Sequence, residues 1–242
     1  MRISRIYQEG DYHPGLCMAL SKAAGHHVSR VLRLQKGAVL HLFNGEGVEC
    51  EAVITQIEKH QVQVEVTGFV TSAPESKLAI TLFQGISKGE TMDFSIQKSV
   101  ELGVHAIAPM ITDRSQGPFS TEHLHKKLLH WQGIIISACE QSGRAVLPVL
   151  YPPVTFKKII FTELPGVPIL LNPEGSITFK DLPFDTNTVS LFIGPEGGFS
   201  DDEIALAAQH KVKNVNCGPR ILRTETASLA AMTLLQHCFG DL

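Results

Sequence analysis

The chain has 242 residues, which is enough for one large domain or two modest ones. Hydrophobic residues make up 43% and charged residues 19%, with 20 Gly and 13 Pro, a composition typical of a globular protein that excludes disordered, collagen-like and coiled-coil chains. No apolar stretch approaches the roughly 18 residues of a membrane span, and the N-terminus lacks the apolar core of a signal peptide, so we expect a cytoplasmic protein with no membrane partner.

The net charge of −3 hides a strong local asymmetry. Residues 1–36 carry six Lys or Arg side chains against two acidic ones, whereas residues 37–70 carry one Lys against five Glu. A basic patch of this kind either is a solvated surface or contacts a polyanion such as RNA through its phosphates. The candidate RNA contacts are Arg2, Arg5, Arg30 and Arg33.

The first seventy residues have the pattern of a small β-rich unit with one helix. Asn44-Gly45 lies between two strand-like runs, which is a strong hairpin signal. Apolar side chains between Val28 and Leu32 lie at helical spacing and Gly37 is a natural helix end, so the pattern predicts a helix over residues 25–37. The predicted strands cover residues 3–6, 38–43, 48–57 and 62–66.

A polar, proline-bearing stretch at residues 71–76 is typical of a domain boundary. After it, strand-like runs alternate with helical segments, which predicts an α/β domain with a largely parallel sheet and helices on both faces. The clearest helix is an apolar stripe that follows the capping residues Ser120-Thr121. The predicted strands cover residues 78–83, 106–110, 146–150, 167–171, 189–193 and 212–216.

The turn Gly194-Pro195-Glu196-Gly197-Gly198 leaves one of these strands and leads into a helix. Ser200 and Glu203 have the spacing of a capping box at the start of that helix. In open parallel sheets ligands bind outside the carboxyl ends of the strands, so the turn can bring its backbone close to a flat ligand. The turn lacks the Gly-rich phosphate motifs and Glu196 would repel a phosphate, which favours a cofactor without phosphate groups. A purely structural tight turn is the alternative.

A second loop, residues 217–227, follows another strand and has the sequence Cys-Gly-Pro-Arg-Ile-Leu-Arg-Thr-Glu-Thr-Ala. Together with residues 194–200, this loop resembles the bacterial small-subunit ribosomal RNA uracil-N3 methyltransferases of the SPOUT superfamily. The resemblance covers essentially the whole chain, the N-terminal part only loosely. It extends to Lys88-Gly89, Glu101-Leu102-Gly103-Val104, Thr112-Asp113-Arg114-Ser115 and residues 140–144.

This resemblance implies a PUA-like β-barrel domain for RNA binding over residues 1–72, followed by a SPOUT methyltransferase domain over residues 73–242. The second domain is expected to be an α/β trefoil-knot domain with a parallel sheet, although topology rules alone would exclude a knot because threaded chains are very rare. The resemblance also implies a homodimer that binds S-adenosylmethionine. Its implied activity is methyl transfer to N3 of a uridine in 16S ribosomal RNA, with the assembled 30S subunit as the expected substrate.

By the family pattern, the cofactor lies among three loops, with backbone groups near the adenine and Leu222 among its apolar contacts. In the structural alternative the same glycines and prolines only shape turns, and no cofactor binds. The residues implied are Leu171, Asn172, Gly194, Pro195, Glu196, Gly197, Gly198, Cys217, Gly218, Ile221, Leu222, Arg223, Thr224, Thr226 and Ala227.

Methyl transfer to a uridine needs in-line alignment of donor and acceptor, and a means of offsetting charge as N3 loses its proton. An arginine suits that charge because its guanidinium stays protonated at any working pH. Arg223 lies in the cofactor loop and can equally anchor this loop by pairing with Glu196 or Glu225. A glutamate is suited to orient an arginine or accept a proton, although each of these residues also fits a packing or surface role. The candidate catalytic residues are, in order, Arg144, Arg114 and Arg223, together with Glu140.

Other chemistries have less support in the sequence. His123 and His125 are two residues apart and would not share a helix face, and no Cys or carboxylate recurs at ligand spacing, so we predict no metal. The five cysteines are odd in number and widely spaced, which argues against a disulfide framework and a zinc ribbon. The chain also lacks the nucleophile elbow of a hydrolase and the glycine fingerprint of a nicotinamide-dependent reductase. A noncatalytic RNA-binding module on the same fold stays open as the alternative.

Overall fold

The computed structural model describes residues 3–58, 61–117, 119–182 and 186–242, so Arg2 lies outside the described part of the chain. The chain divides into two compact units. The first contains residues 1–75 and 136–147, and the second contains residues 76–135 and 148–242. The expected boundary lay between residues 72 and 73. Residues 136–147, which we expected in the second domain, cluster with the first unit.

The first unit is built on one five-stranded sheet with the order β1-β3-β4-β5-β2. β1 runs parallel to β3, and the other neighbours are antiparallel. The hairpin predicted at Asn44-Gly45 joins β3 to β4, and the Asn44 side-chain oxygen accepts hydrogen bonds from the N–H groups of Glu46 and Val48. The strands are β1 (Ser4–Tyr7), β2 (Cys17–Ala19), β3 (Val39–Phe43), β4 (Glu49–Ile57) and β5 (Val62–Val70).

The N-terminal helix begins and ends earlier than the sequence predicts. Ser21 caps α1 (Lys22–His26) through a backbone N–H of the first turn, and the helix continues as a π-helical segment, η1 (His27–Val31). Arg33 then adopts a left-handed backbone with φ of 54°, which a right-handed helix cannot accommodate. The prediction of a helix that continues to Gly37 is therefore wrong, because the chain leaves the helical conformation before that glycine.

A buried ion pair joins β1 to β4. Arg5 Nε and Nη2 donate to the two carboxylate oxygens of Glu49, both at 2.9 Å, and the side chains are only 9% and 5% exposed. Arg5 also donates to the carbonyl oxygens of Cys139 and Arg144, at 2.7 and 3.2 Å. The guanidinium is thus enclosed within the first unit, which corrects the expectation that Arg5 is placed to contact RNA phosphates.

The environment of Glu49 stabilises its charged form. Burial raises the pKa of this carboxyl, but hydrogen bonding to Arg5 and the charge of Arg5, with further hydrogen bonds to Ser72 and His41, outweigh burial and hold the pKa below its usual value. The Arg5 guanidinium carbon lies 4.7 Å from the centroid of the Phe43 ring, a cation–π contact. Removing one partner of such a pair leaves the other charged, buried and unpaired.

The second unit contains a seven-stranded sheet in which every described strand pair is parallel. Its order is β12-β10-β11-β6-β7-β8, and β9 pairs with β7 beside β8. Because β10, β11 and β12 are adjacent and parallel, the loops that follow them lie at the same edge of the sheet. The strands are β6 (Ala79–Gly85), β7 (Ala106–Ile111), β8 (Val149–Leu150), β9 (Val154–Thr155), β10 (Val167–Leu171), β11 (Thr188–Ile193) and β12 (Lys213–Val215).

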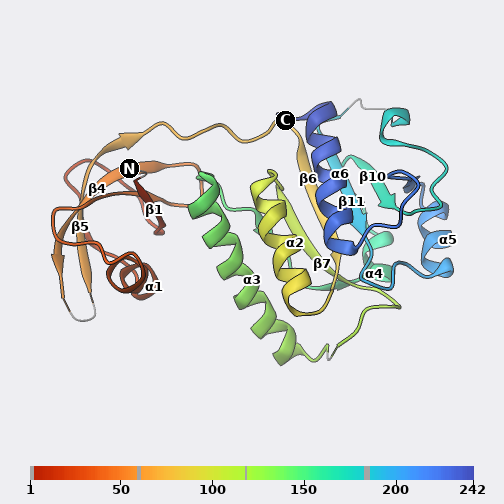
Figure 1. The fold of residues 1–242 in the computed structure, drawn as a ribbon, viewed down its shortest axis with the longest axis horizontal. Helices are drawn as coiled ribbons and strands as arrows, with labels where there is room; N and C mark the ends of the chain where they lie inside the picture. The colour runs from red at the N-terminus through yellow and green to blue at the C-terminus, as the bar shows by residue number, and fades with distance from the viewer. Residues whose placement is uncertain (1–2, 59–60, 118, 183–185) are drawn as a thin grey trace. The chain divides into compact units, whose positions relative to one another are not determined.

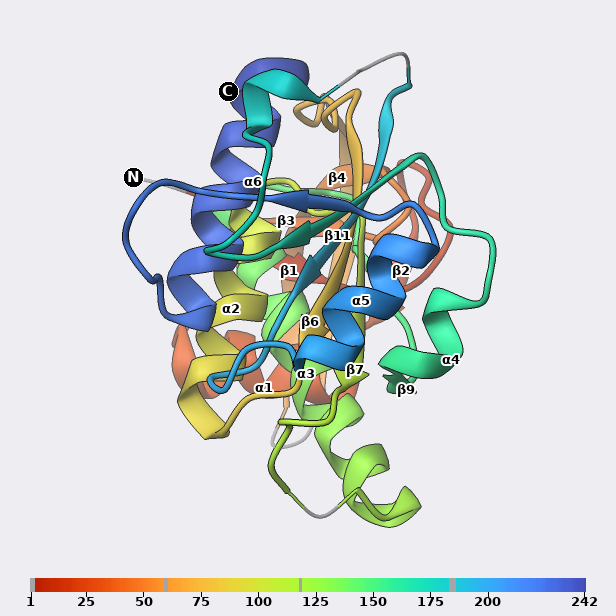
Figure 2. The ribbon, with the colours of Figure 1, turned by 90° about the vertical axis from the view of Figure 1, so that its right-hand side faces the viewer.

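Helices cover both faces of this sheet, as the sequence predicts (Figure 1, Figure 2). α2 packs against α6 on one face, and α4 packs against α5 on the other. The core beneath α4 and α5 includes Phe83, which stacks on Phe192 with ring centroids 4.5 Å apart. The helices are α2 (Gly89–Glu101), α4 (Phe156–Ile160), η2 (Phe179–Asp181), α5 (Asp201–Gln209) and α6 (Thr224–Phe239). A further helix, α3 (Thr121–Ser142), begins in the second unit, and its residues from 136 onward belong to the first.

The predicted strand over residues 146–150 is shorter in the structure. Val146 forms bridges with Gly45 and Glu46 inside the first unit, and only Val149–Leu150 pairs with β7 in the second. The sequence shows a continuous run that favours a strand, but its first residues find their hydrogen-bond partners in the turn between β3 and β4.

We expect Arg5→Met to lower the free energy of unfolding by about 3 kcal/mol at pH 7, because Glu49 would stay buried without its cation. The pKa of Glu49 is lowered in the folded protein, so the pair contributes fully above the ordinary glutamate pKa of about 4.3 and loses its contribution as the pH falls through the lower folded value. The difference between parent and variant should therefore shrink below about pH 4. Urea unfolding of the full chain across this pH range measures it.

The control for this prediction is Glu122→Gln, which breaks an exposed pair with Lys126 on α3. Both side chains of that pair are more than two-thirds exposed, so we expect no measurable loss of stability. A loss for Arg5→Met that is the same at pH 7 and below pH 4 would show that side-chain packing, and not charge, holds β1 to β4.

Candidate functional site

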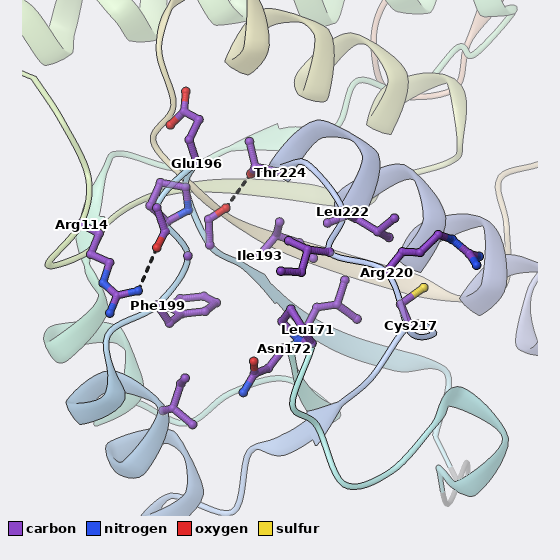
Figure 3. A pocket seen from close by; sticks show the side chains of 18 of the residues that line it. Arg114, Leu171, Asn172, Ile193, Glu196, Phe199, Cys217, Arg220, Leu222 and Thr224 are labelled. Atoms are coloured by element: carbon purple, nitrogen blue, oxygen red, sulfur yellow. Dashed lines mark hydrogen bonds between the residues drawn. The ribbon is translucent and has the colours of Figure 1, made fainter.

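The second unit contains a cavity at the carboxyl ends of three neighbouring strands (Figure 3). Its volume is about 330 Å³, and its walls come largely from the segments that follow β10, β11 and β12. Asn172, Phe199 and Leu222 lie far apart in the sequence and line this one hollow. In open parallel sheets the carboxyl edge is where ligands bind, because the loops there present free backbone groups.

The turn after β11 is shaped by its glycines and by the start of α5. Gly198 has a φ of 69°, a conformation that favours glycine, and its N–H donates to the Pro195 carbonyl at 2.8 Å. The Ser200 hydroxyl accepts a hydrogen bond from the Glu203 N–H, and the Glu203 carboxylate accepts one from the Ser200 N–H at 2.9 Å. The predicted capping box is therefore confirmed.

The same turn lies against the end of β6 at a place where a side chain has no room. A Cβ added to Gly85 would lie 2.4 Å from the Pro195 backbone nitrogen and 2.8 Å from the Gly194 carbonyl carbon. Real atoms do not approach so closely, so any side chain at position 85 must push the turn away from β6. Gly85 belongs to no motif that sequence reasoning singled out.

Thr224, the first residue of α6, joins the two main loops. Its buried hydroxyl donates to the Gly194 carbonyl at 2.5 Å and accepts from the Gln84 side-chain amide at 3.0 Å. The same amide nitrogen donates to the Gly85 carbonyl at 3.2 Å. This chain of hydrogen bonds fixes the end of β6, the turn after β11 and the start of α6 relative to one another.

The loops that follow β10 and β12 are also bonded to each other. The Asn172 N–H donates to the Val215 carbonyl at 2.9 Å, and the Asn216 N–H donates to the Ile177 carbonyl at 2.8 Å. The Asn216 side-chain oxygen accepts from the Gly218 N–H at 2.6 Å. Backbone groups of these two loops thus hold each other, and the side chains of Asn172 and Leu171 remain on the cavity side.

Three charged residues border the cavity. Arg114 donates to the Gly197 carbonyl at 3.0 Å, whereas Arg220 points outward (Figure 3). Glu196 accepts a hydrogen bond from the Lys88 N–H at the start of α2. The expected ion pair of Arg223 with Glu196 or Glu225 is not formed among the described residues.

Every predicted cofactor residue except Arg223 and Thr226 lines this cavity. Arg223 is the N-cap residue of α6, and both of these side chains are exposed. Besides Arg114, which was predicted as a catalytic candidate, five lining residues were not in the predicted cofactor set. Two of them, Phe199 and Ile204, are parts of the apolar cluster beneath α5. A strand residue that directly precedes a glycine-rich turn is the signal that could have found Ile193. The five are Pro173, Ile193, Phe199, Ile204 and Arg220.

The candidate catalytic residues are divided between the two units. Arg114 lines the cavity of the second unit, whereas Arg144 and Glu140 belong to the first unit. Arg144 Nη2 and Nε donate to the Glu75 carboxylate at 2.6 and 3.2 Å. Glu140 accepts from the Tyr7 N–H at 3.1 Å, and its burial raises the pKa of its carboxyl. Of these candidates, Arg114 lies at the wall of this cavity.

The remaining candidate RNA contacts lie on the N-terminal helix and just after it. Arg30 is part of η1 and Arg33 follows it, and both side chains are exposed. Lys22 and Lys36 are exposed on the same stretch of chain. The basic character noted in the sequence is therefore surface charge at these positions, in contrast to the enclosed guanidinium of Arg5.

The described residues contain no group of three or more His, Cys, Asp or Glu side chains arranged to hold a metal ion. In the same part of the chain, no helix is long and apolar enough to span a bilayer. All five cysteines are free thiols, and burial raises the pKa of Cys217, the one that borders the cavity.

Comparison with known families assigns both parts of the chain. Residues 74–236 match the model of an RNA methyltransferase domain. Residues 20–67 match the model of an RNA methyltransferase PUA domain. The two matches cover most of the chain and follow the order of the two units.

Similar proteins of known name or structure extend over the full chain. Ribosomal RNA small subunit methyltransferase E of Buchnera aphidicola subsp. Schizaphis graminum is 39% identical over 245 residues, which are 100% of this chain and 98% of that protein. A methyltransferase structure from Legionella pneumophila, in complex with SAM, is 45% identical with a TM-score of 0.97, and each chain is covered completely. Ribosomal RNA small subunit methyltransferase E of Neisseria gonorrhoeae, bound to S-adenosyl methionine, is 35% identical with a TM-score of 0.93, again over both full chains.

The two family matches place the chain among the RNA methyltransferases that carry a PUA domain. Within that class the chain belongs to the family of ribosomal RNA small subunit methyltransferase E.

We expect Gly85→Ala to lower the free energy of unfolding by about 3 kcal/mol, because the added methyl group overlaps the backbone of the turn at Pro195. The matched control is Gly133→Ala in α3, where a Cβ meets nothing within 4 Å. The control should raise stability by about 0.5–1 kcal/mol, since alanine favours a helix over glycine. Thermal unfolding of both variants tests this. Equal effects of the two changes would show that β6 and the turn are not in contact.

Proposed function

We propose that this protein transfers the methyl group of S-adenosylmethionine to N3 of a uridine in 16S ribosomal RNA. The observation that carries the proposal is the cavity of about 330 Å³, which three adjacent strand-end loops share in a chain of the RNA methyltransferase family. Two structures similar over the full chain have this ligand bound. Small-subunit RNA is the proposed substrate because the curated relatives are named for it.

The residues of the cavity fit S-adenosylmethionine. This ligand has a flat adenine and an amino-acid end, and it carries no phosphate. Leu171, Ile193 and Leu222 provide apolar walls for the adenine, and the turn over residues 194–198 offers backbone groups for its polar edge. The turn has no phosphate-binding motif and includes Glu196. Of the two arginines at the cavity, Arg114 is bonded to the Gly197 carbonyl and Arg220 points outward. These lining residues therefore favour a nucleoside ligand over a nucleotide.

Bound S-adenosylmethionine supplies an activated methyl group on a sulfonium. The chain itself must hold donor and uridine in line, a positioning effect worth up to about 7–11 kcal/mol. The hydrogen bonds of Thr224 and Gln84 fix the loops before any ligand arrives, so little ordering is left to the binding step. The loops that these hydrogen bonds join thus align the methyl donor with the uridine.

The second task is to offset the negative charge that spreads over the uracil oxygens as N3 loses its proton. We assign this task to Arg114, which borders the cavity and bonds Gly197 through one of its five N–H groups. Arg144 is paired with Glu75 within the first unit, so its charge is already offset there. We assign Arg144 and Glu140 to the support of the RNA-binding unit.

RNA recognition is proposed to rest on the first unit. The exposed Arg30 and Arg33 are suited to phosphates, which position the substrate without reading its sequence. N3 lies on the base-pairing edge of uracil, so the target uridine must be unpaired or turned out. A folded 30S subunit that presents such a uridine is the proposed substrate.

The resemblance to SPOUT enzymes carries three further parts of the proposal. The C-terminal segment forms a trefoil knot, the protein is a homodimer, and it acts in the cytoplasm, where ribosomal subunits are assembled. The knot would make the cavity loops hard to unravel, since a threaded chain must be withdrawn before they can separate.

We expect the purified chain to bind S-adenosylmethionine in calorimetry and to add one methyl group to 16S RNA in 30S subunits, detected by mass spectrometry of RNA digests. A methyl group on N3 blocks base pairing, so primer extension should stop one nucleotide before the modified uridine. Binding without methyl transfer to subunits or free RNA would instead support a noncatalytic RNA-binding module.

A pair of variants links binding to the cavity. Leu222→Asp places a carboxylate in the apolar wall and should weaken S-adenosylmethionine binding at least about tenfold. Leu129→Asp makes the same change at a position on α3 that is 63% exposed, and it should leave binding unchanged. Equal binding by both variants would place the ligand elsewhere.

We expect Arg114→Ala to lower kcat for methyl transfer about 100-fold while the Kd for S-adenosylmethionine changes less than about threefold, because the lost guanidinium acts on the uracil charge. Arg144→Ala should chiefly lower the free energy of unfolding, because the ion pair between Arg144 and Glu75 is lost. Single-turnover assays on 30S subunits and thermal unfolding separate the two. Loss of turnover in Arg144→Ala alone, at unchanged stability, would move the catalytic role to Arg144.

A further inference from the structure

The carboxylate of Glu203 makes a second hydrogen bond besides that of the capping box of α5. Glu203 is 1% exposed, although it is a charged residue in the first turn of a helix. Among the described residues, no Lys, Arg or His side chain lies within 4 Å of its carboxylate. A buried charge without a neighbouring cation must be stabilised by hydrogen bonds. The donors of those bonds therefore identify the segments that the carboxylate connects.

Each oxygen of Glu203 binds a different loop. Oε2 accepts from the N–H of Ser200, at the end of the turn after β11, at 2.9 Å. Oε1 accepts from the N–H of Asp113, in the loop after β7, at 3.0 Å. The first bond is the ordinary capping bond, and the second reaches a segment 90 residues earlier in the chain. The carboxylate therefore bridges two loops of the cavity region.

Two further bonds connect the same loops. The Ser200 hydroxyl donates to the Asp113 carboxylate at 3.0 Å. Arg114, the residue after Asp113, donates to the Gly197 carbonyl at 3.0 Å. Since Asp113 and Arg114 are adjacent, fixing the backbone of one sets the place from which the other side chain reaches the cavity.

The chemistry at this position requires a carboxylate. Two backbone N–H groups point at it, and only a group that accepts at both oxygens satisfies both. Its negative charge is further stabilised by the N-terminus of α5. A glutamine of the same size would turn its amide N–H₂ toward one of the two donors, and that bond would be lost.

We propose that Glu203 is a positioning residue for methyl transfer, which holds Arg114 at the cavity by clamping the loop after β7 to the turn after β11. The inference rests on the proposed function of Arg114. Glu203 does not line the cavity, so it acts through Arg114 and not on the ligand.

A double-mutant cycle tests this inference. Glu203→Gln should lower kcat on 30S subunits about tenfold and leave the Kd for S-adenosylmethionine within about threefold of the parent value. In the Arg114→Ala background the same substitution should change kcat less than about twofold, because the residue through which it acts is gone. A role in general stability alone would lower kcat by the same factor in both backgrounds, and that result would overturn the inference.

The matched control is Asp202→Asn, which makes the same change of charge at the exposed neighbouring position of α5 and should leave kcat unchanged. If Glu203→Gln does not fold, Glu203→Asp serves, since its shorter carboxylate keeps the charge but reaches only one of the two donors. Additive effects of Glu203→Asp and Arg114→Ala would equally overturn the inference. A parent chain that transfers no methyl group would instead refute the proposed function, which keeps the two failures distinct.

Discussion

The backbone of the turn after β11 must pass so close to β6 that no side chain fits between them, while its other side remains open to a ligand. Gly85 meets the first requirement, because a Cβ there would lie 2.4 Å from the backbone of Pro195. The turn is held in place by hydrogen bonds with the side chains of Thr224, Arg114 and Glu203. These bonds leave its other side open to a ligand. The other features of the cavity depend on this placement, since each of its three loops is bonded to a neighbour.

We propose that the site recognises S-adenosylmethionine mainly with backbone groups and apolar walls. Such groups carry no net charge, which suits a nucleoside with an amino-acid end better than a phosphate. Of the charged side chains that border the cavity, Arg114 is bonded to the Gly197 carbonyl and Glu196 to the Lys88 N–H. Glu203, a buried carboxylate beside the site, accepts hydrogen bonds from the backbone N–H groups of Asp113 and Ser200.

Much of the fold could be predicted from local pattern. The strand predicted over residues 167–171 is β10, and the hairpin at Asn44-Gly45 and the capping box of Ser200 are present. These features depend on residues near one another in the sequence, whose spacing reveals them. The predicted helix does not reach Gly37 because Arg33 has a left-handed backbone. The predicted strand does not begin at Val146 because this residue forms isolated bridges with Gly45 and Glu46.

Local pattern in the sequence predicts a β-rich part followed by a parallel α/β part, and the family resemblance adds the loops expected to bind the cofactor. The surroundings of the charged side chains could not be predicted in this way and depend on how the chain folds. Arg5, Arg114 and Arg144 are alike in the sequence, yet one is enclosed against Glu49, one lines the cavity and one is paired with Glu75. The physical reason is that the environment of a guanidinium is set by carboxylates and carbonyls brought to it by folding, often from more than 40 residues away.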